Sequence, residues 1–545
     1  MQIGESLPKQ LNCGNIFTFL ALFSAFSIVL SLWLGTFFWR DSLIIAGLAV
    51  LAALLVMRKF PLGIKLPKTV VALAVLMFIL CAYPAFVYTP FFGGSADAAQ
   101  TITMRVIGET IPQTYEPYSG ITLGYYLGYH LFTKIFVDLF PVVPDTLWLV
   151  LCGAFFAAME LIAVYLLGRK LGNSENAGLY PAILFLGTKS VFQNMYWGMH
   201  PMIAGMFFAV LAAYLFLEKK PHVYLFLPLT LACHAGAAFN AFILLAAMVL
   251  FLRGPFLDRA KIIDFAKLGL SSIVVIPSLL TTYAIFIANA IAGNTPDAVV
   301  TIQSLAERFF MLPLWNGIIP SIILPFSAFS LVAGRNITEE KDKRAIAMLV
   351  TVLAATTFSF FFLFIAAKAM SLLSIAAVIF CGLALSKFIS FESGKMKALV
   401  LVLCLLTFFT SGLLTELREG TKITSEETEF ANYFKEKYPE LSPTLFLTKN
   451  GLKIAELSNK IPYDVYADFP DHVFLAYGTW QTHHDEYWNE IAERKNRQDM
   501  ILAEKCAGCI SELSVKYVVV EEDFPAVQGK KLFEKYGFKV YGAGG

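Results

Sequence analysis

The stretch DTLWLVLCGAFFAAMELIAVYLLGRK, residues 145–170, is an apolar run that ends in two basic residues. Over residues 145–168 the only charged side chains are Asp145 and Glu160. A run of this length can cross the roughly 30 Å hydrocarbon core of a bilayer as an α-helix. Arg169 and Lys170 follow directly, and basic residues that flank a span gather on its cytoplasmic side. The stretch therefore predicts a transmembrane helix that ends in the cytoplasm.

The same alternation of apolar runs and basic clusters continues along most of the chain. Hydrophobic residues make up 57% of the 545 residues and charged residues only 15%, and the mean hydropathy is +0.67. Between residues 15 and 414, basic residues fall in every second gap, whereas the long gap 89–145 contains only Arg105 and Lys134. This asymmetry gives the orientation of each span. The clusters predicted to be cytoplasmic are Arg58–Lys68, Arg169–Lys170, Lys219–Lys220, Arg253–Lys267, Arg335–Arg344 and Lys387–Lys397.

With the basic gaps assigned to the cytoplasm, the chain is predicted to cross the membrane about 12–13 times. Stretch 222–252 is too long for one span and both its ends lie beside basic clusters, so we expect it to enter and return with a bend near Cys233–Gly236. A crossing at 121–140 would put Arg169–Lys170 outside, so we expect a helix at the outer interface there, within the outer loop 90–144. The predicted crossings are 14–36, 42–57, 69–89, 145–168, 176–195, 200–217, the pair in 222–252, 268–291, 313–332, 345–366, 370–389 and 398–415.

The N-terminus is predicted to be a cytoplasmic signal anchor. Its apolar run of about 23 residues is longer than the hydrophobic region of a cleaved signal peptide, and no small-x-small cleavage site follows it. The net charge of +2 is too small to indicate a nucleic-acid partner. The chain is therefore expected to be a multi-pass protein of a cell membrane, with the lipid bilayer as its first partner.

The composition changes sharply after residue 415, and charges and turn residues then reach the levels of soluble domains. We expect residues 1–415 to form the membrane body and residues 416–545 to form a small extracytoplasmic α/β domain. Thr424 and Glu427 have the spacing of a capping box, which predicts a helix over 424–437. The sequence VKYVVV predicts a strand that is buried on both faces. The other predicted elements are strands at 473–477, 515–520 and 538–541 and helices at 482–503 and 529–536.

Cysteine usage separates the two parts of the chain. Six of the eight cysteines lie in or beside apolar segments, where Cys behaves as a small hydrophobic residue. Cys506 and Cys509 lie outside in the motif Cys-Ala-Gly-Cys. An exported C-x-x-C can be a local disulfide or half of a zinc site, and no second Cys pair completes a four-ligand set. The disulfide is the candidate that we retain.

Asp97 is the acidic residue best placed for chemistry. It follows the span 69–89 within a few residues, which puts it at the outer membrane surface. There a carboxylate can accept a proton from an incoming hydroxyl while a lipid-borne leaving group stays at headgroup depth. The alternative is structural, because Asp97 followed by Gln100 also has the spacing of a helix N-cap and its capping-box partner.

The chain order of several features extends this interpretation. In order they are Asp97 in the first outer loop, Gly108-x-x-x-Pro112, Gly128-Tyr129-His130 in the interfacial helix, Arg169–Lys170 after a span, the bend at His234 and the strand 515–520. This order resembles the GT-C superfamily of membrane glycosyltransferases, which includes protein O-mannosyltransferases and lipid A aminoarabinose transferases. The bend at His234 is similar to a break between two membrane segments in many members, and the C-terminal domain resembles one that some members append.

The resemblance implies a function. GT-C enzymes use polyprenyl-phosphate sugars as donors, so we expect an inverting glycosyltransferase acting on a glycan, lipid or protein acceptor at the outer face of a prokaryotic membrane. Asp97 matches the early acid that serves as catalytic base or metal-proximal carboxylate in the family. A divalent cation, Mg²⁺ or Mn²⁺, is a possible cofactor. No Asp-x-Asp and no second acid beside Asp97 is present, so no metal ligand is assigned.

A phosphate-bearing donor needs positive charge at the same face. A Lys near the interface can snorkel to headgroup depth at little cost. The candidates for contact with the lipid phosphate are Arg105, Lys189, Arg308 and Lys368, and the candidates for lining a cavity near Asp97 are Glu109, Glu116, His130, His200 and His234.

Two other classes of protein remain as alternatives. A transporter or lipid flippase is expected to show interrupted helices in two related halves and charges near the midplane. In this sequence only one break is evident, at His234, and most charges lie near the outer face. A non-catalytic assembly protein with a binding ectodomain would not need Asp97.

Overall fold

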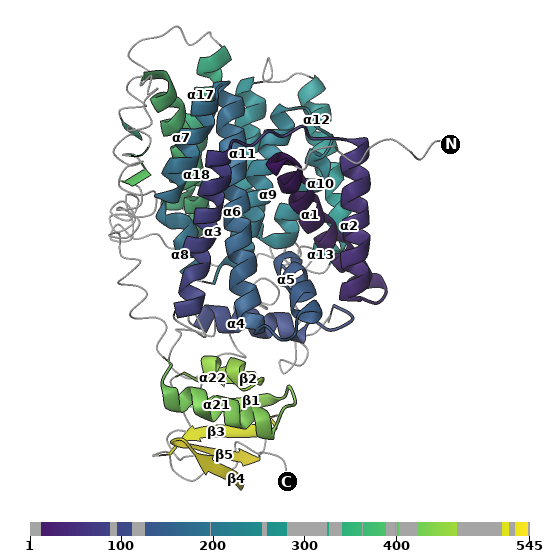
Figure 1. Ribbon diagram of the computed structural model, residues 1–545, viewed down its shortest axis with the longest axis vertical. Helices are drawn as coiled ribbons and strands as arrows, with labels where there is room; N and C mark the ends of the chain where they lie inside the picture. Colours follow the sequence, from purple (N-terminus) through teal and green to yellow (C-terminus); the bar gives the residue numbers. More distant parts are fainter. Residues whose placement is uncertain are drawn as a thin grey trace.

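The computed structural model shows a bundle of helices with a small α/β domain at one end (Figure 1). Long apolar helices together with a C-terminal sheet confirm the predicted fold class, a polytopic α-helical membrane protein with a small C-terminal domain. The described residues are 12–87, 95–111, 126–196, 198–252, 259–280, 324–325, 340–361, 363–388, 398, 401–402, 423–448, 450–465, 515–522 and 529–542.

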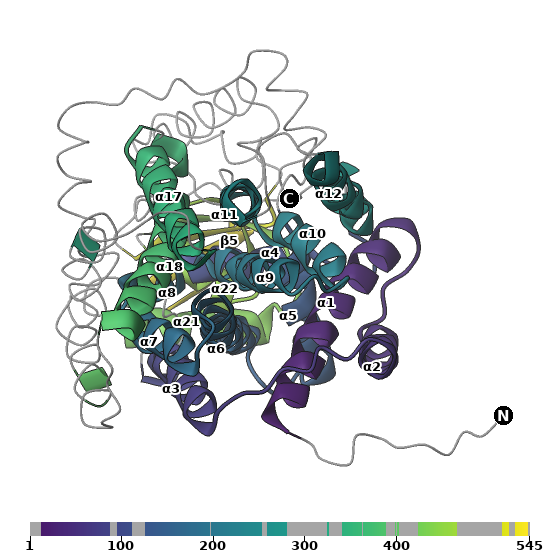
Figure 2. The same ribbon diagram turned by 90° about the horizontal axis from the view of Figure 1, so that it is seen from above.

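Within this part of the chain, five helices are long and apolar enough to cross a membrane by length and composition. The central one is α6 (Asp145–Gly172), which packs against α3, α7 and α9 (Figure 2). At about 1.5 Å per residue its 28 residues extend roughly 42 Å, more than the hydrocarbon core requires. The other four are α1 (Cys13–Phe37), α2 (Ser42–Lys59), α9 (His200–Leu217) and the part Ala369–Ser386 of α18 (Leu363–Phe388). Two further helices, α3 (Lys68–Val87) and α17 (Glu340–Phe361), have shorter apolar parts.

The predicted span 176–195 is interrupted. It consists of α7 (Glu175–Leu186) and α8 (Lys189–Tyr196), separated at Gly187–Thr188. The hydroxyl of Thr188 donates a hydrogen bond of 2.8 Å to the carbonyl of Phe185 and so satisfies one of the free carbonyls at the end of α7. Lys189 therefore begins a new short helix and does not lie inside a continuous span.

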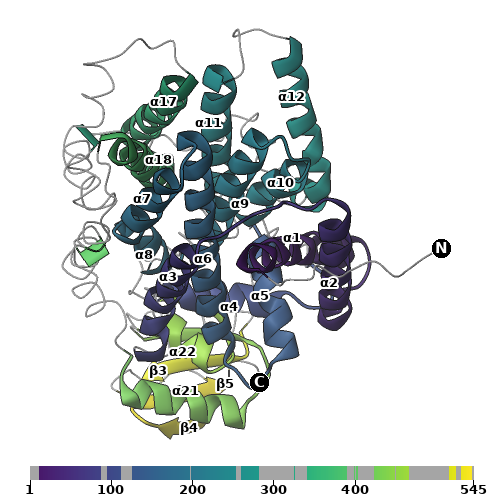
Figure 3. The ribbon, with the colours of Figure 1, turned by 45° about the horizontal axis from the view of Figure 1, so that its top comes forward.

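The predicted bend in residues 222–252 is present (Figure 3). Helix α10 (Val223–Cys233) and helix α11 (Ala235–Leu252) meet at His234, whose backbone is extended with φ −167° and ψ 130°. The bend packs on Gly205 of α9, where an added Cβ would lie 2.4 Å from the Cβ of Ala237. Gly205 is five residues from the start of α9, or about 7.5 Å along the axis. The chain thus reverses inside the bundle.

Two short helices cover the end of the bundle that faces the C-terminal domain (Figure 1). They are α4 (Ser95–Val106) and α5 (Gly128–Leu139). The predicted interfacial helix 121–140 is thus observed from Gly128 onward, with its first residues buried against α1, α6, α9 and α10. Gly128 permits the close contact with α10, because a Cβ there would lie 2.8 Å from the carbonyl oxygen of Ala232.

Two further spans have different bounds from those predicted. Of the predicted span 268–291, the structure describes residues 268–280, in which the end of α12 (Arg259–Leu270) is followed by the 3₁₀ helix η1 (Ser271–Val275) and α13 (Ile276–Ser278), and the remaining residues lie outside the described part of the chain. Helix α18 begins at Leu363, whereas the prediction began at 370. Lys368 therefore lies inside α18, in its second turn, and not between two spans. The predicted spans 313–332 and 398–415 lie almost entirely outside the described residues.

The C-terminal domain contains a five-stranded sheet in the order β2-β1-β3-β5-β4. Strand β1 is parallel to β2 and β3, with Thr444 opposite Tyr517, and β5 is antiparallel to β3 and β4. The valines of β3 are fully buried, as predicted. The capping box at Thr424 and Glu427 is also confirmed. The elements are α21 (Ser425–Lys437), β1 (Pro443–Leu447), α22 (Gly451–Leu457), β2 (Ile461–Val465), β3 (Tyr517–Glu521), β4 (Lys530–Lys535) and β5 (Phe538–Gly542).

The predicted helix 529–536 was wrong, because this segment forms β4. Tyr536 and Gly537 have φ values of 55° and 77°, and two successive positive φ values are typical of a tight hairpin turn between antiparallel strands. The turn pairs β4 with β5. The predicted strand 473–477 and helix 482–503 lie outside the described residues.

Candidate functional site

Asp97 is the third residue of α4, which begins at Ser95. This placement corrects the structural alternative, since Asp97 lies inside the first turn and is not the N-cap. An acid in the first turn still interacts favourably with the helix dipole. The structure describes the backbone of Asp97 but not its side chain. Helical spacing puts the Cα atoms of Asp97 and Gln100 on the same face of α4.

Gln100 links α4 to α5 through a buried hydrogen bond. The Nε2–H of His130 donates to Oε1 of Gln100 over 2.5 Å, and both side chains are buried. Burial lowers the pKa of His130 to about 3, with a further contribution from His200, against a hydrogen bond to the backbone of Tyr126. His130 is therefore neutral at physiological pH.

The three predicted cavity histidines, His130, His200 and His234, form a cluster around α5 that we call the histidine cluster. Tyr129, the residue directly before His130 in α5, stacks its ring on that of His200 at a centroid distance of 5.9 Å. The ring of Tyr126 lies 5.5 Å from that of His234. All three histidines are buried. Of the three, His130 contacts α4 directly through Gln100, whereas His200 and His234 contact aromatic side chains in α5 and just before it.

The close packing at His200 depends on Gly153 in α6. A Cβ at Gly153 would lie 2.6 Å from Nδ1 of His200. His234 is held in turn by its own bend, because its Nδ1 accepts a hydrogen bond of 3.0 Å from the backbone N–H of Gly236. These contacts fix the histidine cluster inside the end of the bundle that α4 covers.

Glu109 does not join this cluster. Its side chain is exposed, and its backbone carbonyl accepts a hydrogen bond of 2.8 Å from the N–H of Arg40. Arg40 is buried and forms an ion pair of 3.1 Å with Asp138 of α5. Asp138 also accepts a hydrogen bond of 2.6 Å from Ser42. Sequence reasoning missed this link, although Arg40 is a lone arginine in a short polar gap between two apolar runs.

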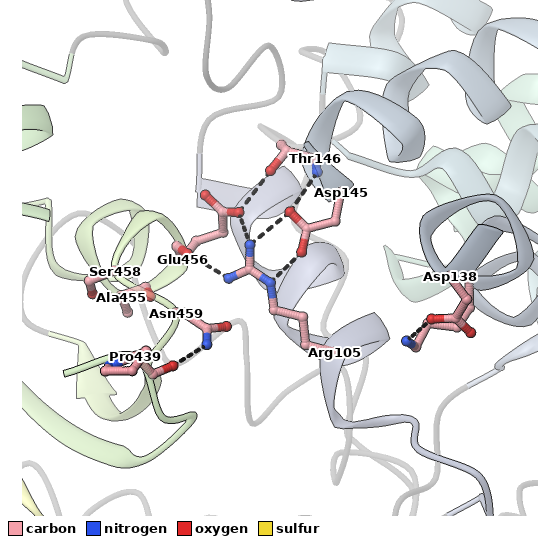
Figure 4. A network of polar contacts seen from close by, with 10 residues as sticks. Arg105, Asp138, Asp145, Thr146, Pro439, Ala455, Glu456, Ser458 and Asn459 are labelled. Carbon is pink, nitrogen blue, oxygen red and sulfur yellow. Dashed lines mark hydrogen bonds and ion pairs between the residues drawn. The ribbon is translucent and has the colours of Figure 1, made fainter. Parts of the chain in front are cut away.

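Arg105 connects the membrane body to the C-terminal domain and does not face a lipid phosphate (Figure 4). Its Nε and one Nη donate to both oxygens of Asp145, over 2.5 and 2.8 Å. Its Nη groups also donate to the backbone carbonyl and to Oε1 of Glu456 in α22, over 2.5 and 2.6 Å. Thr146 donates to the same Oε1 over 2.7 Å. The predicted phosphate contact of Arg105 is therefore replaced by a junction of Arg105, Asp145, Thr146 and Glu456.

At this junction the guanidinium of Arg105 binds the carboxylates of both Asp145 and Glu456. Burial opposes the charge on Arg105, but Glu456 and Asp145 outweigh it and raise the pKa of the guanidinium. Burial also raises the pKa of Glu456, an effect that Arg105 opposes and Asp145 strengthens. The junction lies at the N-terminus of α6 and anchors α22 on α4, the helix that carries Asp97.

Lys189 and Lys368 lie on neighbouring helices. Lys189 is the first residue of α8 and Lys368 is in the second turn of α18. These helices are joined by a hydrogen bond of 2.9 Å from Nδ2 of Asn194 to Oγ of Ser371. The side chains of the two lysines are not described. Arg308, Glu116, Cys506 and Cys509 lie outside the described residues.

Within the residues that the structure describes, no three His, Cys, Asp or Glu side chains are grouped so that they could hold a metal ion. We therefore assign no residue to Mg²⁺ or Mn²⁺ and derive no step through either ion.

Solved structures of two membrane glycosyltransferases resemble this chain. The apo structure of the aminoarabinose transferase ArnT from Cupriavidus metallidurans aligns over 87% of this chain and 97% of its own, with a TM-score of 0.53 and 12% identity. The arabinofuranosyltransferase AftD from Mycobacteria aligns over 89% of this chain with a TM-score of 0.51 and 13% identity. This chain covers only 40% of AftD. No family model and no curated protein matches the sequence.

Both proteins are GT-C membrane glycosyltransferases, and ArnT aligns over nearly its whole length. At 12–13% identity the likeness concerns the fold. The chain therefore has the GT-C fold, as the sequence resemblance predicted.

Proposed function

We propose that this protein is an inverting glycosyltransferase that uses a polyprenyl-phosphate sugar as donor. It transfers the sugar to a glycan, lipid or protein acceptor at the membrane face that carries the C-terminal domain, the outer face of a prokaryotic cell membrane. The fold shared with ArnT and AftD supports glycosyl transfer. Both of these relatives transfer an arabinose-type sugar by name, which makes five-carbon sugars the first donors to test.

The observation that carries the proposal is the placement of Asp97. Its helix α4 lies at the end of the bundle, between the bundle and the C-terminal domain (Figure 1). On the bundle side it is anchored by the bond between Gln100 and His130, and on the other side α22 holds it through Arg105. A carboxylate on a helix fixed at both faces has the preorganisation that a general base requires.

In the proposed reaction the acceptor hydroxyl oxygen attacks C1 of the sugar, and the bond from C1 to the phosphate oxygen breaks. The hydroxyl proton passes to Asp97, and polyprenyl phosphate leaves with the bonding electrons. Attack opposite the leaving group inverts the configuration at C1. Lys189 and Lys368, on the joined helices α8 and α18, are proposed to counter the charge of the departing phosphate, together with Arg308.

The test uses the purified full-length protein in detergent with a panel of polyprenyl-phosphate sugars, pentoses first, and acceptors from each of the three classes. We expect one donor to be consumed, with one polyprenyl phosphate released per glycoside formed. NMR coupling constants of the product should show the anomeric configuration opposite to that of the donor. Retention of configuration would contradict the mechanism. A labelled lipid that crosses the bilayer unchanged, without transfer, would instead favour the flippase.

A further inference from the structure

A polar cavity lies at the end of α6 opposite the C-terminal domain. Its volume is about 580 Å³, within the range of about 300–1,000 Å³ that is usual for small-molecule sites. It is formed by the loop before α3, the last turn of α6, the start of α7 and the end of α9. Because α6 extends roughly 42 Å from Asp145, this cavity is remote from Asp97 and the histidine cluster.

The walls of the cavity carry four cations and two carboxylates. Lys170 and Glu218 neutralise each other in an ion pair of 2.6 Å. The only other carboxylate in the wall is that of Glu175, in the first turn of α7. The remaining cations are Lys65, Arg169 and Lys220.

These three cations are available to a ligand. In the described part of the chain none of them forms an ion pair. Arg169 donates from its Nη1 to the carbonyl of Lys65 over 3.2 Å and also hydrogen-bonds the side chain of Tyr165. A guanidinium has five donors, so most of those of Arg169 remain for an anion. The wall therefore has an excess of positive charge that the protein itself does not neutralise.

The depth of the cavity matches that of a lipid headgroup. Arg169 lies in the last turn of the spanning helix α6, and Tyr214 in the last turn of α9, both at the positions where basic and aromatic residues meet the membrane interface. The wall also contains Leu62, Ile64 and Leu166, whose side chains are almost fully buried in the bundle, so the polar side chains provide most of its open surface.

We infer that this cavity binds the phosphate group of an anionic lipid in the leaflet away from the C-terminal domain. Arg169 and Lys220 contact the phosphate oxygens, and Lys65 closes the site from the loop. This site is separate from the proposed transfer reaction. It differs from general attraction of lipids to a basic face, because it depends on which cations are present and binds one molecule.

The test is native mass spectrometry of the delipidated full-length protein titrated with phosphatidylglycerol. Three proteins are compared: the wild type, the double variant Arg169→Gln/Lys220→Gln and the double variant Arg58→Gln/Lys68→Gln. Arg58 and Lys68 are exposed at the same end of the bundle and do not line the cavity. Both double variants lose two positive charges, so general attraction changes equally in both.

We expect the wild type and the Arg58/Lys68 variant to retain one lipid with the same affinity, and the Arg169/Lys220 variant to bind it about tenfold more weakly, since each 1.4 kcal/mol of binding free energy is a factor of ten. Equal weakening in the two double variants would overturn the proposal. If Arg169→Gln/Lys220→Gln lowers the unfolding temperature, Lys65→Gln, an exposed loop substitution, takes its place and should weaken binding as well.

Glycerol phosphate distinguishes the source of the phosphate. Added at the lipid concentration, it should not displace the lipid, because it lacks the acyl chains. Displacement that is lost in Arg169→Gln/Lys220→Gln would keep the phosphate site but assign it to a soluble phosphate ester, and would overturn the lipid as its ligand.

Discussion

At the scale of a single residue, Asp97 has a proposed catalytic role and a place in the first turn of α4, and substitution can separate the two. Asp97→Asn keeps the size of the side chain but removes its basicity and its charge at the N-terminus of α4. Loss of the dipole interaction should cost about 0.3–1 kcal/mol of stability. Loss of general-base assistance should lower the single-turnover rate by about 10²–10⁴-fold.

The measurement is single-turnover transfer with the donor identified from the panel, together with the unfolding temperature. Asp41→Asn is the matched control, because Asp41 caps α2 by accepting from the N–H of Ile44 and lies outside the proposed site. A rate for Asp97→Asn as close to wild type as that of Asp41→Asn would remove Asp97 from catalysis.

His130 provides a prediction for pH. Its pKa is about 3 in the folded protein and 6.5 in a free side chain, so the unfolded state takes up the proton first as the pH falls. The stability that neutral His130 contributes is therefore fully present above pH 6.5 and is lost progressively as the pH falls toward 3. At pH 5 the loss relative to high pH is about 2 kcal/mol.

Thermal or chemical unfolding of wild type and His130→Gln across this pH range measures the difference. Gln cannot titrate but can still hydrogen-bond to Gln100, so the slope should be shallower in the variant. The exposed substitution Glu109→Gln is the control, and its stability should depend on pH with the same slope as that of the wild type. Parallel slopes for wild type and His130→Gln would contradict a neutral, buried His130.

At the scale of elements, the contact between α4, α6 and α22 depends on Arg105. Arg105→Met leaves Asp145 and Glu456 without their shared cation in a buried place. Breaking a buried pair in this way typically costs about 3–5 kcal/mol. We expect a loss of this size in the free energy of unfolding of the full-length protein in detergent.

Glu456→Gln is the matched control at the same junction. Gln can still accept from Arg105 and Thr146 through Oε1, and it removes one of the two negative charges that share the guanidinium. Its cost should be well below that of Arg105→Met. Equal costs would mean that the charge of Arg105 is not what holds α22 on α4.

Particular elements show what could be predicted from the sequence. Helix α9 runs over residues 200–217, as predicted, because an apolar run between polar turns has only one way to satisfy its backbone in a bilayer. The break at Gly187–Thr188 was missed, although polar residues from Thr188 to Asn194 interrupt the apolar run at that point. Strand β4 was missed because its identity comes from the turn at Tyr536–Gly537 and from pairing with β5.

In the candidate site too, some features could be predicted from the sequence and others depend on contacts between distant parts of the chain. His130, His200 and His234 could be expected at one face because membrane topology alone places them there. The junction could not be predicted, since Arg105 and Glu456 are 351 residues apart and no local pattern relates them. The spacing of Asp97 and Gln100 suggested a cap, but α4 begins two residues earlier, and Gln100 instead binds His130.

At the scale of the whole molecule, the two ends of the bundle differ in chemistry. The C-terminal domain and α4 lie at one end of the bundle (Figure 1), where His130 binds α4. The basic cavity is formed by the last turn of α6 and its neighbours, at the opposite end of that helix. If the basic end faces the cytoplasm, donor lipid must be used in the opposite leaflet. The sidedness of transfer therefore tests orientation and function together.

The most direct test is transfer in proteoliposomes selected, by a tag at residue 545, for an outward C-terminal domain. A short-chain polyprenyl-phosphate sugar is supplied either outside or inside the vesicles, with wild type or Asp97→Asn. The account predicts product only with donor outside and only with the wild type. Product formed only from donor inside, or formed equally by Asp97→Asn, would contradict it.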